Sequence, residues 1–174
     1  MAKIILITGG TRSGKSYNAM KKALSYEGKR LFIATATACD NEMEERIRGH
    51  RMERGDQFTT IEAPYALSSV LESCRESPPE VVLVDCMTVW IGNLMYRHAD
   101  TTEKITAEID AFINTITDLP MDCIFVTNEV GLGIVPDNEM AREFRDLAGT
   151  VNRRVAERAD EVYVSICGIQ MKIK

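Results

Sequence analysis

The stretch ITGGTRSGKS, residues 7–16, decides the fold of this 174-residue chain. Its glycine, lysine and serine positions fit G-x-x-x-x-G-K-[ST], the phosphate-binding loop (P-loop), in which successive backbone N–H groups converge on phosphate oxygens. Glycine permits this close approach because it has no Cβ. We expect Lys15 to reach the outer phosphates of a nucleoside triphosphate, and the Ser16 hydroxyl to ligate a Mg²⁺ ion that bridges them. The alternative is a glycine-rich turn with an exposed lysine, but the apolar run 4–7 before the loop and the helical pattern after it favour a P-loop.

The composition limits the class of protein. The net charge of −5 comes from interspersed acidic and basic residues, so no footprint for nucleic acid is visible. The cysteines lack C-x-x-C spacing, which argues against a disulfide framework and a zinc site and indicates a reducing compartment. They are Cys39, Cys74, Cys86, Cys123 and Cys167. No apolar run approaches the length of about 20 residues that spans a bilayer. We therefore expect a cytoplasmic protein without a membrane span, folded as a single domain over residues 1–174.

Short β-rich runs alternate along the chain with helical patterns, which predicts an α/β fold with a mostly parallel sheet and helices on both faces. Strands are expected near residues 3–7, 30–35, 81–85, 122–127 and 161–166, and helices near 15–26, 41–54, 66–75, 102–118 and 138–158. In the last helix, apolar residues at helical spacing predict a core-facing stripe of Met140, Phe144, Leu147, Val151 and Val155. The alternation of apolar and polar residues at 169–174 predicts a half-buried edge strand.

Asp85 ends the apolar strand VVLVD, residues 81–85. In nucleotide-binding α/β folds, an acidic residue at the carboxyl end of a strand lies at the ligand edge of the sheet, where it can hold Mg²⁺ directly or through water. The competing interpretation is that Asp85 caps the helical segment that follows. The chain contains no N-K-x-D tetrapeptide, with which signalling GTPases read guanine, so any base selection must be made in another way.

The stretch CDNEMEERIRGHRMERG, residues 39–55, predicts a charged helix with a histidine among arginines. On this helix His50 lies one turn from Arg46 and one turn from Arg54, with Arg51 adjacent. Positive neighbours disfavour imidazolium, so His50 should be neutral and nucleophilic while the arginines attract an anion. From spacing alone, a solvated surface histidine is the competing interpretation.

Several blocks together give the chain a resemblance to a known family. They are TGGTRSGKS, IATATACDNEMEERIRGHR, VDCMTVWIGNL, TNEVGLGIVP and AREFRDLAGTVNRRVAERADEVYVSICGIQMKIK. The chain closely resembles the bifunctional adenosylcobinamide kinase/adenosylcobinamide-phosphate guanylyltransferases of cobalamin biosynthesis. The blocks occur in the family's order and cover nearly the whole chain, and R-I-x-x-H-R and T-N-E-V-G-x-G-I-V-P are specific to it. The resemblance implies a RecA-like P-loop NTPase assembled as a homotrimer, with the corrinoid substrate near a subunit boundary.

The resemblance also implies two successive group transfers. First, a hydroxyl on the aminopropanol arm of adenosylcobinamide takes the γ-phosphoryl group of ATP or GTP. Then GTP donates GMP to a histidine with release of pyrophosphate, and adenosylcobinamide phosphate attacks that intermediate to give adenosylcobinamide-GDP. The family's histidine falls on His50, and Lys15 is expected to serve both transfers. The family's nucleotide contacts fall on Gly9, Gly10, Thr11, Arg12, Ser13, Gly14, Lys15, Ser16, Thr35, Ala36, Thr37, Arg51, Met52, Glu53, Arg54, Glu62 and Asp85.

Two further carboxylates and one departure from the family complete the candidate site. Glu62, after the strand-like run 58–61, is suited to accept hydrogen bonds from guanine N1–H and N2–H, with an ordinary surface carboxylate as the alternative. Glu129, beside VGLGIVP, is a candidate to orient a nucleophile or a metal-bound water, or belongs to a plain strand-to-helix connection. The family reads S-R-x-A-E after the P-loop, whereas this chain reads SYNAM at 16–20 and lacks two of those charges. We expect the loss of these charges to affect the kinase step more than the guanylyl transfer.

Two other classes of protein also fit a P-loop. A monofunctional kinase for another small alcohol would use Lys15 and Asp85 but would never carry a nucleotide on His50. A nucleotide-gated binding switch would hydrolyse its nucleotide slowly and respond to a protein partner.

Overall fold

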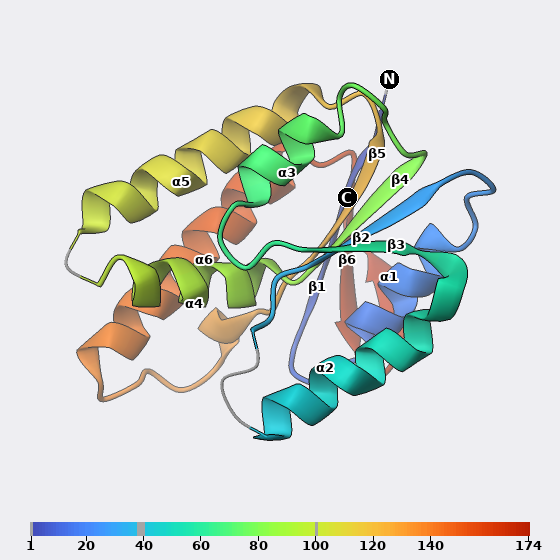
Figure 1. Ribbon diagram of the computed structural model, residues 1–174. Helices are drawn as coiled ribbons and strands as arrows, with labels where there is room; N and C mark the ends of the chain where they lie inside the picture. Colours follow the sequence, from blue (N-terminus) through green and yellow to red (C-terminus); the bar gives the residue numbers. More distant parts are fainter. Residues whose placement is uncertain (1, 38–40, 100) are drawn as a thin grey trace.

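The computed structural model describes residues 2–37, 41–99 and 101–174, without the side chains of residues 41–43, 46, 50 and 53 (Figure 1). The described residues form a seven-stranded sheet with the order β3-β2-β4-β5-β1-β6-β7. The strands are β1 (Ile4–Gly9), β2 (Arg30–Ala34), β3 (Thr59–Glu62), β4 (Val81–Asp85), β5 (Asp122–Val126), β6 (Glu161–Ile166) and β7 (Ile169–Lys172). β7 runs antiparallel to β6, and the other neighbouring pairs are parallel. The predicted α/β fold with a mostly parallel sheet is confirmed.

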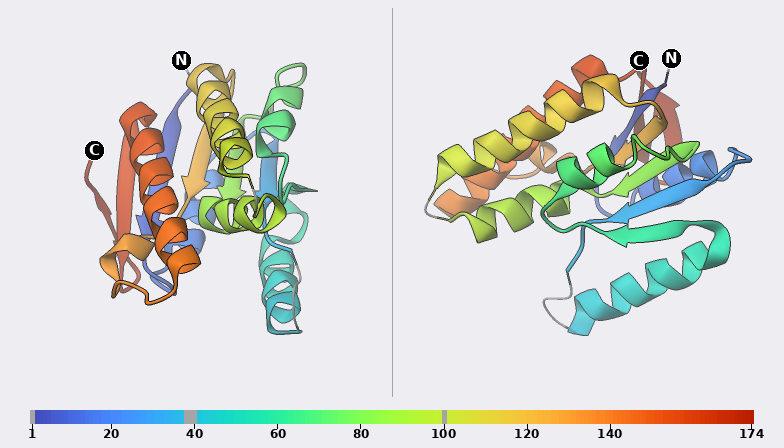
Figure 2. Two further views of the ribbon diagram at one scale, coloured as in Figure 1. Left: turned by 90° about the vertical axis from the view of Figure 1, so that its left-hand side faces the viewer. Right: turned by 45° about the horizontal axis from the view of Figure 1, so that its top comes forward.

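Helices cover both faces of this sheet. They are α1 (Lys15–Ala23), α2 (Asn41–Arg54), α3 (Leu67–Ser73), α4 (Met87–Arg97), α5 (Thr102–Thr115) and α6 (Glu139–Arg158), with short 3₁₀ turns η1 (Gly55–Gln57), η2 (Ile116–Asp118) and η3 (Val130–Leu132). The ribbon shows α3, α4, α5 and α6 on one face and α1 and α2 on the other (Figure 1), and the views of Figure 2 agree. The right-hand view of Figure 2 places α2 beside the edge strand β3.

The core consists of two layers because the strands bury alternate residues on opposite faces. Leu6 and Val84 pack in the cluster under α3–α6, whereas Ile5, Ile7 and Leu83 belong to the cluster under α1. Strands buried on both faces are nearly continuous in apolar residues, and these are the runs from which the strands could be predicted.

Helix α4 is missing from the predicted series of helices. Its sequence, MTVWIGNLMYR, contains a glycine and β-branched residues, which have lower helix propensity than alanine or leucine. Burial outweighs this propensity, because Trp90, Ile91 and Leu94 are almost completely buried on one side of the helix. The Trp90 ring lies 5.0 Å from that of Phe112, and its Nε1–H donates to the Tyr65 carbonyl at 2.9 Å.

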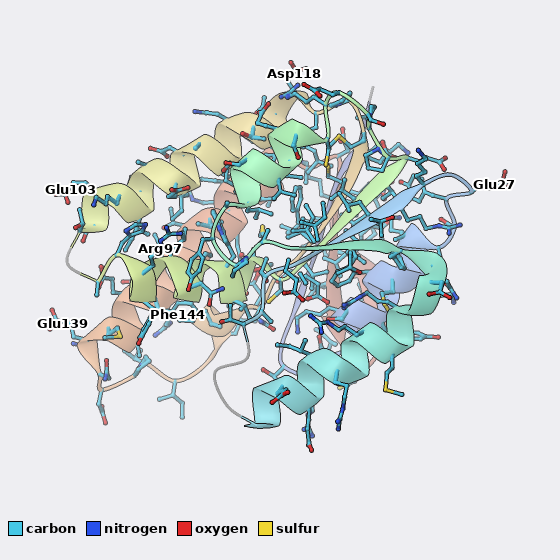
Figure 3. All side chains as sticks on the ribbon, in the orientation of Figure 1. Glu27, Arg97, Glu103, Asp118, Glu139 and Phe144 are labelled. Atoms are coloured by element: carbon cyan, nitrogen blue, oxygen red, sulfur yellow. The ribbon has the colours of Figure 1, made fainter. Side chains whose placement is uncertain are left out.

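The predicted core stripe of α6 holds for its later turns and is wrong for its first. Val151 and Val155 are fully buried and Phe144 packs partly against the core, but Met140 is 67% exposed. Figure 3 shows Glu139 at the outer end of α6 and Phe144 nearer to α4. The first turn therefore lies at the periphery of the molecule, beyond the elements that could bury it.

The C-terminal stretch forms the predicted edge strand, but the prediction that it is half-buried is wrong. Ile169, Met171 and Ile173 are 67%, 47% and 65% exposed. β7 lies at the margin of the sheet, and its apolar side chains belong to neither of the two core clusters of the described residues. Alternation alone could not reveal whether another element covers the apolar face.

Two remaining observations concern the cysteines and membranes. Cys74, Cys86, Cys123 and Cys167 carry free thiols, whereas Cys39 lies outside the described residues. Within residues 2–37, 41–99 and 101–174, no helix is both long and apolar enough to cross a membrane.

Candidate active site

The P-loop connects β1 to α1, and its backbone requires glycine at two places. Gly9 has φ +155°, and an added Cβ would collide with the carbonyl oxygen of Ser165. Gly14 has φ +87° and caps α1, and its added Cβ would lie 3.1 Å from the Cα of Gly168. The Gly168 N–H also donates to the Ser13 carbonyl at 3.0 Å. The turn between β6 and β7 therefore packs directly behind the P-loop, a contact that the loop pattern does not reveal.

Lys15 begins α1 and is 8% exposed. Its Nζ donates to the Gly10 carbonyl at 2.9 Å, so the ammonium lies against its own loop. Burial lowers the pKa of Lys15, because an ammonium loses hydration there, and the nearby Cys86 and Asp85 partly offset this effect. The alternative of an exposed lysine in a glycine-rich turn is therefore wrong.

Asp85 lies at the carboxyl end of β4, at the same edge of the sheet as the P-loop. The N-cap residue of α4 is Cys86, whose side chain makes no capping hydrogen bond, so Asp85 does not occupy the N-cap position that the competing interpretation gave it. Thr35 is completely buried, and its hydroxyl donates to the Cys86 carbonyl at 2.8 Å and accepts from the Cys86 N–H at 2.9 Å. Burial raises the pKa of Cys86 to about 12, so its thiol is not a nucleophile at neutral pH.

A cavity of about 580 Å³ brings most of the predicted site together. Of the predicted nucleotide contacts, it is lined by Thr11, Arg12, Ser13, Gly14, Lys15, Ser16, Ala36, Arg51, Arg54, Glu62 and Asp85. A second cavity of about 390 Å³ shares Ala36, Arg51 and Glu62 with the first and adds Thr37. The loop, the end of β4 and helix α2 therefore face one continuous region.

The other predicted site residues do not line these cavities, or their side chains lie outside the described part of the chain. Gly9 and Gly10 shape the loop without lining either cavity, and Thr35 is engaged with the backbone of Cys86. Met52 is 77% exposed and lines neither cavity. The side chains of His50 and Glu53 belong to the part that the structure does not describe, although both residues lie within helix α2.

Two arginines of α2 approach the cavity in different ways. Arg51 forms an ion pair with Glu62 at the end of β3, and both side chains are more than half exposed. Arg54 is 5% exposed, and its guanidinium lies 4.0 Å from the centre of the Phe32 ring. Glu62 is therefore paired and not isolated on the surface, and Arg54 forms part of the cavity wall.

Several lining residues were not predicted as site residues, although Ile47, Val89 and Asn128 fall within the blocks that carry the family resemblance. The unpredicted lining residues are Tyr17, Phe32, Ile47, Val89 and Asn128. Phe32 lies in a buried strand and is indistinguishable in sequence from a core residue. Asn128 follows β5, and only the pairing of β5 between β1 and β4 brings it between the P-loop and Asp85.

The residue after Asn128 belongs to a polar network that contacts the first glycine of the P-loop. Glu129 Oε1 accepts from Thr8 Oγ1 at 2.7 Å and from Asn152 Nδ2 at 3.2 Å. The Glu129 N–H donates to the Gly9 carbonyl at 3.2 Å. The segment after β5 is thus tied to the P-loop and is more than a plain connection.

The fold and this loop define the chain as a P-loop NTPase. Among solved structures, it is similar to an ATPase from the type III secretion system of pathogenic bacteria (TM-score 0.59, 12% identity), covering 93% of this chain and half of that one. It is also similar to the RadB recombinase (TM-score 0.54, 15% identity), covering 93% of this chain and 73% of that one. Likeness at this identity shows the fold alone, and that fold agrees with the predicted α/β class.

The chain belongs to the cobinamide kinase / cobinamide phosphate guanyltransferase family, whose model matches residues 5–173. It is 38% identical to the bifunctional adenosylcobalamin biosynthesis protein CobU of Escherichia coli, covering 98% of this chain and 99% of that protein. It is 39% identical to the bifunctional adenosylcobalamin biosynthesis protein CobP of Pseudomonas aeruginosa, covering 97% and 96%. The resemblance read from the motifs is confirmed, and so is the class of enzyme.

Proposed function

We propose that this chain performs both transfers of its family at one nucleotide site. It phosphorylates adenosylcobinamide with ATP or GTP, and then moves GMP from GTP through a covalent intermediate on His50 to the phosphorylated corrinoid, releasing pyrophosphate. The observation that carries this proposal is that one and the same cavity is lined by both the P-loop and helix α2. The P-loop end of the cavity fits phosphates, and the other end is lined by helix α2, which carries His50, the proposed acceptor.

The P-loop end has the groups that a triphosphate needs. Lys15 supplies a buried ammonium, and Ser13 Oγ is buried without a hydrogen-bond partner in the described part of the chain. A buried hydroxyl without a partner costs free energy, which a phosphate oxygen would recover. Ser16 and Asp85 line the same cavity and offer the hard oxygen ligands that Mg²⁺ prefers. Bound there with the phosphates, Mg²⁺ would neutralise charge that develops on the leaving oxygens.

Helix α2 supports the role of His50 through its spacing. Ile47, Arg51 and Arg54 of this helix line the cavity, and they are four and three residues apart. Because 3.6 residues form one turn, position 50 lies on the same face of the helix as these residues. A nucleophilic imidazole at that position splits one displacement into two easier ones, and the GMP is held as a phosphoramidate between them.

Glu62 and Arg51 are suited to exchange partners when GTP binds. Their ion pair is more than half exposed on both sides, and exposed pairs contribute only about 0–1 kcal/mol, so breaking it is inexpensive. We propose that Arg51 then turns to the triphosphate, and that Glu62 accepts the N1–H and N2–H hydrogen bonds of guanine. This exchange would supply the base selection for which the chain has no N-K-x-D motif.

We also propose a homotrimer with the corrinoid at a subunit boundary, where more surface is available to enclose so large a substrate. Exposed apolar residues in η3 and the segment after it, and in β7 and the residue after it, support an interface, because exposed apolar surface often marks one. These residues are Leu132, Ile134, Val135, Ile169, Met171 and Ile173. The cytoplasmic location stays a prediction.

Incubation of the pure protein with labelled GTP tests the two-step reaction against the other P-loop functions. Label in the α-phosphate should remain on the denatured protein, survive alkali and be lost in mild acid, as a phosphoramidate requires, whereas label in the γ-phosphate should not remain. A monofunctional kinase or a nucleotide-gated switch would leave no α-label on the protein.

A further inference from the structure

Glu129 has a carboxylate whose two oxygens lie in different situations. Oε1 accepts hydrogen bonds from Thr8 Oγ1 and from Asn152 Nδ2, at 2.7 and 3.2 Å. Within the described part of the chain, Oε2 accepts no hydrogen bond, and Glu129 belongs to no ion pair. The carboxylate is therefore held in one orientation with one oxygen available.

The groups that hold this carboxylate are themselves firmly anchored. Asn152, on α6, is 7% exposed, and its Oδ1 accepts from Thr127 Oγ1 at 2.7 Å. Its Nδ2 also donates to the Asn128 carbonyl at 3.0 Å. Thr8 is almost fully buried at the end of β1. Thr8 and Asn152 together form a clamp on Glu129. Both donors are neutral, so the clamp supplies no cation to offset the negative charge of the carboxylate.

The sheet brings Glu129 next to the place where phosphoryl transfer occurs. β5 pairs with β1 on one side and with β4 on the other, so its carboxyl end lies between the P-loop and Asp85. The Glu129 N–H donates to the carbonyl of Gly9, the first glycine of the P-loop, and the preceding Asn128 lines the nucleotide cavity. Asn128 lines the nucleotide cavity and Glu129 itself lines neither of the two cavities, so an acceptor has to lie beside Asn128, at the margin of the cavity, to meet the free oxygen of Glu129.

We infer that Glu129 is the general base of the kinase step, an inference that rests on the proposed phosphorylation of the corrinoid's hydroxyl. Glu129 Oε2 takes the proton of that hydroxyl as the alcohol oxygen forms a bond to the γ-phosphorus. The bond from the γ-phosphorus to the β,γ-bridging oxygen breaks, and the nucleoside diphosphate leaves with its electron pair. The protonated carboxyl group then returns its proton to solvent. Carboxylates serve this role in protein kinases, where an Asp accepts the substrate hydroxyl proton.

The same base has no task in the guanylyl transfer. The acceptor in that step is a phosphate monoester, whose second pKa is about 6, so it is already an anion at neutral pH. No proton has to be removed from it when it attacks the GMP intermediate. A general base at Glu129 therefore predicts that the two activities of one protein respond differently to a single substitution, whereas a purely structural role predicts a common response.

Glu129→Gln tests this inference, because glutamine keeps an oxygen that can accept from Thr8 and Asn152 but cannot take a proton. The rate of phosphoryl transfer from ATP to adenosylcobinamide should fall about 10²–10⁴-fold, the usual contribution of a general base. Guanylylation of supplied adenosylcobinamide phosphate, and labelling by α-labelled GTP, should stay within about twofold of the wild type. Glu143→Gln, which removes an exposed carboxylate from α6, is the matched control and should change neither rate.

Two results would overturn the inference. A wild-type kinase rate in Glu129→Gln would show that no base acts at this position, and an equal loss of both activities would show that Glu129 only supports the fold of the site. Failure of the proposed function is distinguishable from both, because the wild-type protein itself would then not phosphorylate adenosylcobinamide.

Discussion

Replacing Lys15 by methionine should separate what this residue does for the fold from what it does for the nucleotide. Methionine has similar length and keeps the packing but removes the ammonium, which lies almost fully buried beside Gly10. In GTP binding the variant loses a charge-assisted hydrogen bond to phosphate, worth about 1.5–3 kcal/mol. The dissociation constant for GTP should therefore rise about 10- to 150-fold.

In the absence of nucleotide, Lys15→Met should be as stable as the wild-type protein or more stable. Burial lowers the pKa of Lys15 below its value in the unfolded chain, so the unfolded chain binds the proton more tightly and the charged side chain destabilises the fold near neutral pH. This cost is lost as pH rises from the folded pKa toward the ordinary lysine value. Urea unfolding at about pH 7 should therefore give Lys15→Met a free energy of unfolding at least equal to that of the wild type. As the pH rises toward the ordinary pKa of lysine, the free energy of unfolding of the wild type should increase relative to that of the variant. Wild-type affinity for GTP in a folded Lys15→Met protein, measured by titration calorimetry, would refute the reasoning.

Three further predictions concern other parts of the molecule. Glu62→Gln should reduce the preference for GTP over ATP in steady-state competition, because the amide cannot accept both guanine donors, and an unchanged preference would move base recognition elsewhere. Trp90→Ala should lower the free energy of unfolding by about 3–5 kcal/mol, because it empties a fully buried site and leaves the Tyr65 carbonyl without its donor. If urea unfolding shows a loss below about 1 kcal/mol, the packing described for α4 is contradicted. Light scattering of the wild-type protein should give the mass of three chains, and Met171→Asp on the exposed face of β7 should lower the measured mass toward that of one chain. A wild-type mass of one chain would contradict the proposed homotrimer.

The sequence predicted the parts of the site that depend on local spacing. The distance from Gly9 to Lys15 defines the P-loop whatever surrounds it, and the apolar run before Asp85 identifies a strand whose carboxyl end carries an acidic residue. Both follow from backbone geometry within a few residues, so the structure confirms their place at one edge of the sheet.

Long-range pairing decided what could not be predicted. The clamp on Glu129 joins β1, the segment after β5 and α6, whose contributing residues are separated by 121 and 23 positions along the chain. Phe32 resembles any core residue until Arg54 is seen to stack on it. Helix α4 forms because tertiary burial outweighs weak propensity, and the exposed face of β7 depends on what lies beyond the margin of the sheet.

The most direct test of the two-step account is a comparison of His50→Ala with His98→Ala. These are the two histidines of the chain, and His98 lies at the end of α4, away from the residues that line the nucleotide cavity. The account predicts that His50→Ala still transfers the γ-phosphoryl group to adenosylcobinamide but neither carries label from α-labelled GTP nor makes adenosylcobinamide-GDP, while His98→Ala does all three. Acid-labile α-label on His50→Ala, or its formation of adenosylcobinamide-GDP at the wild-type rate, would contradict the covalent mechanism.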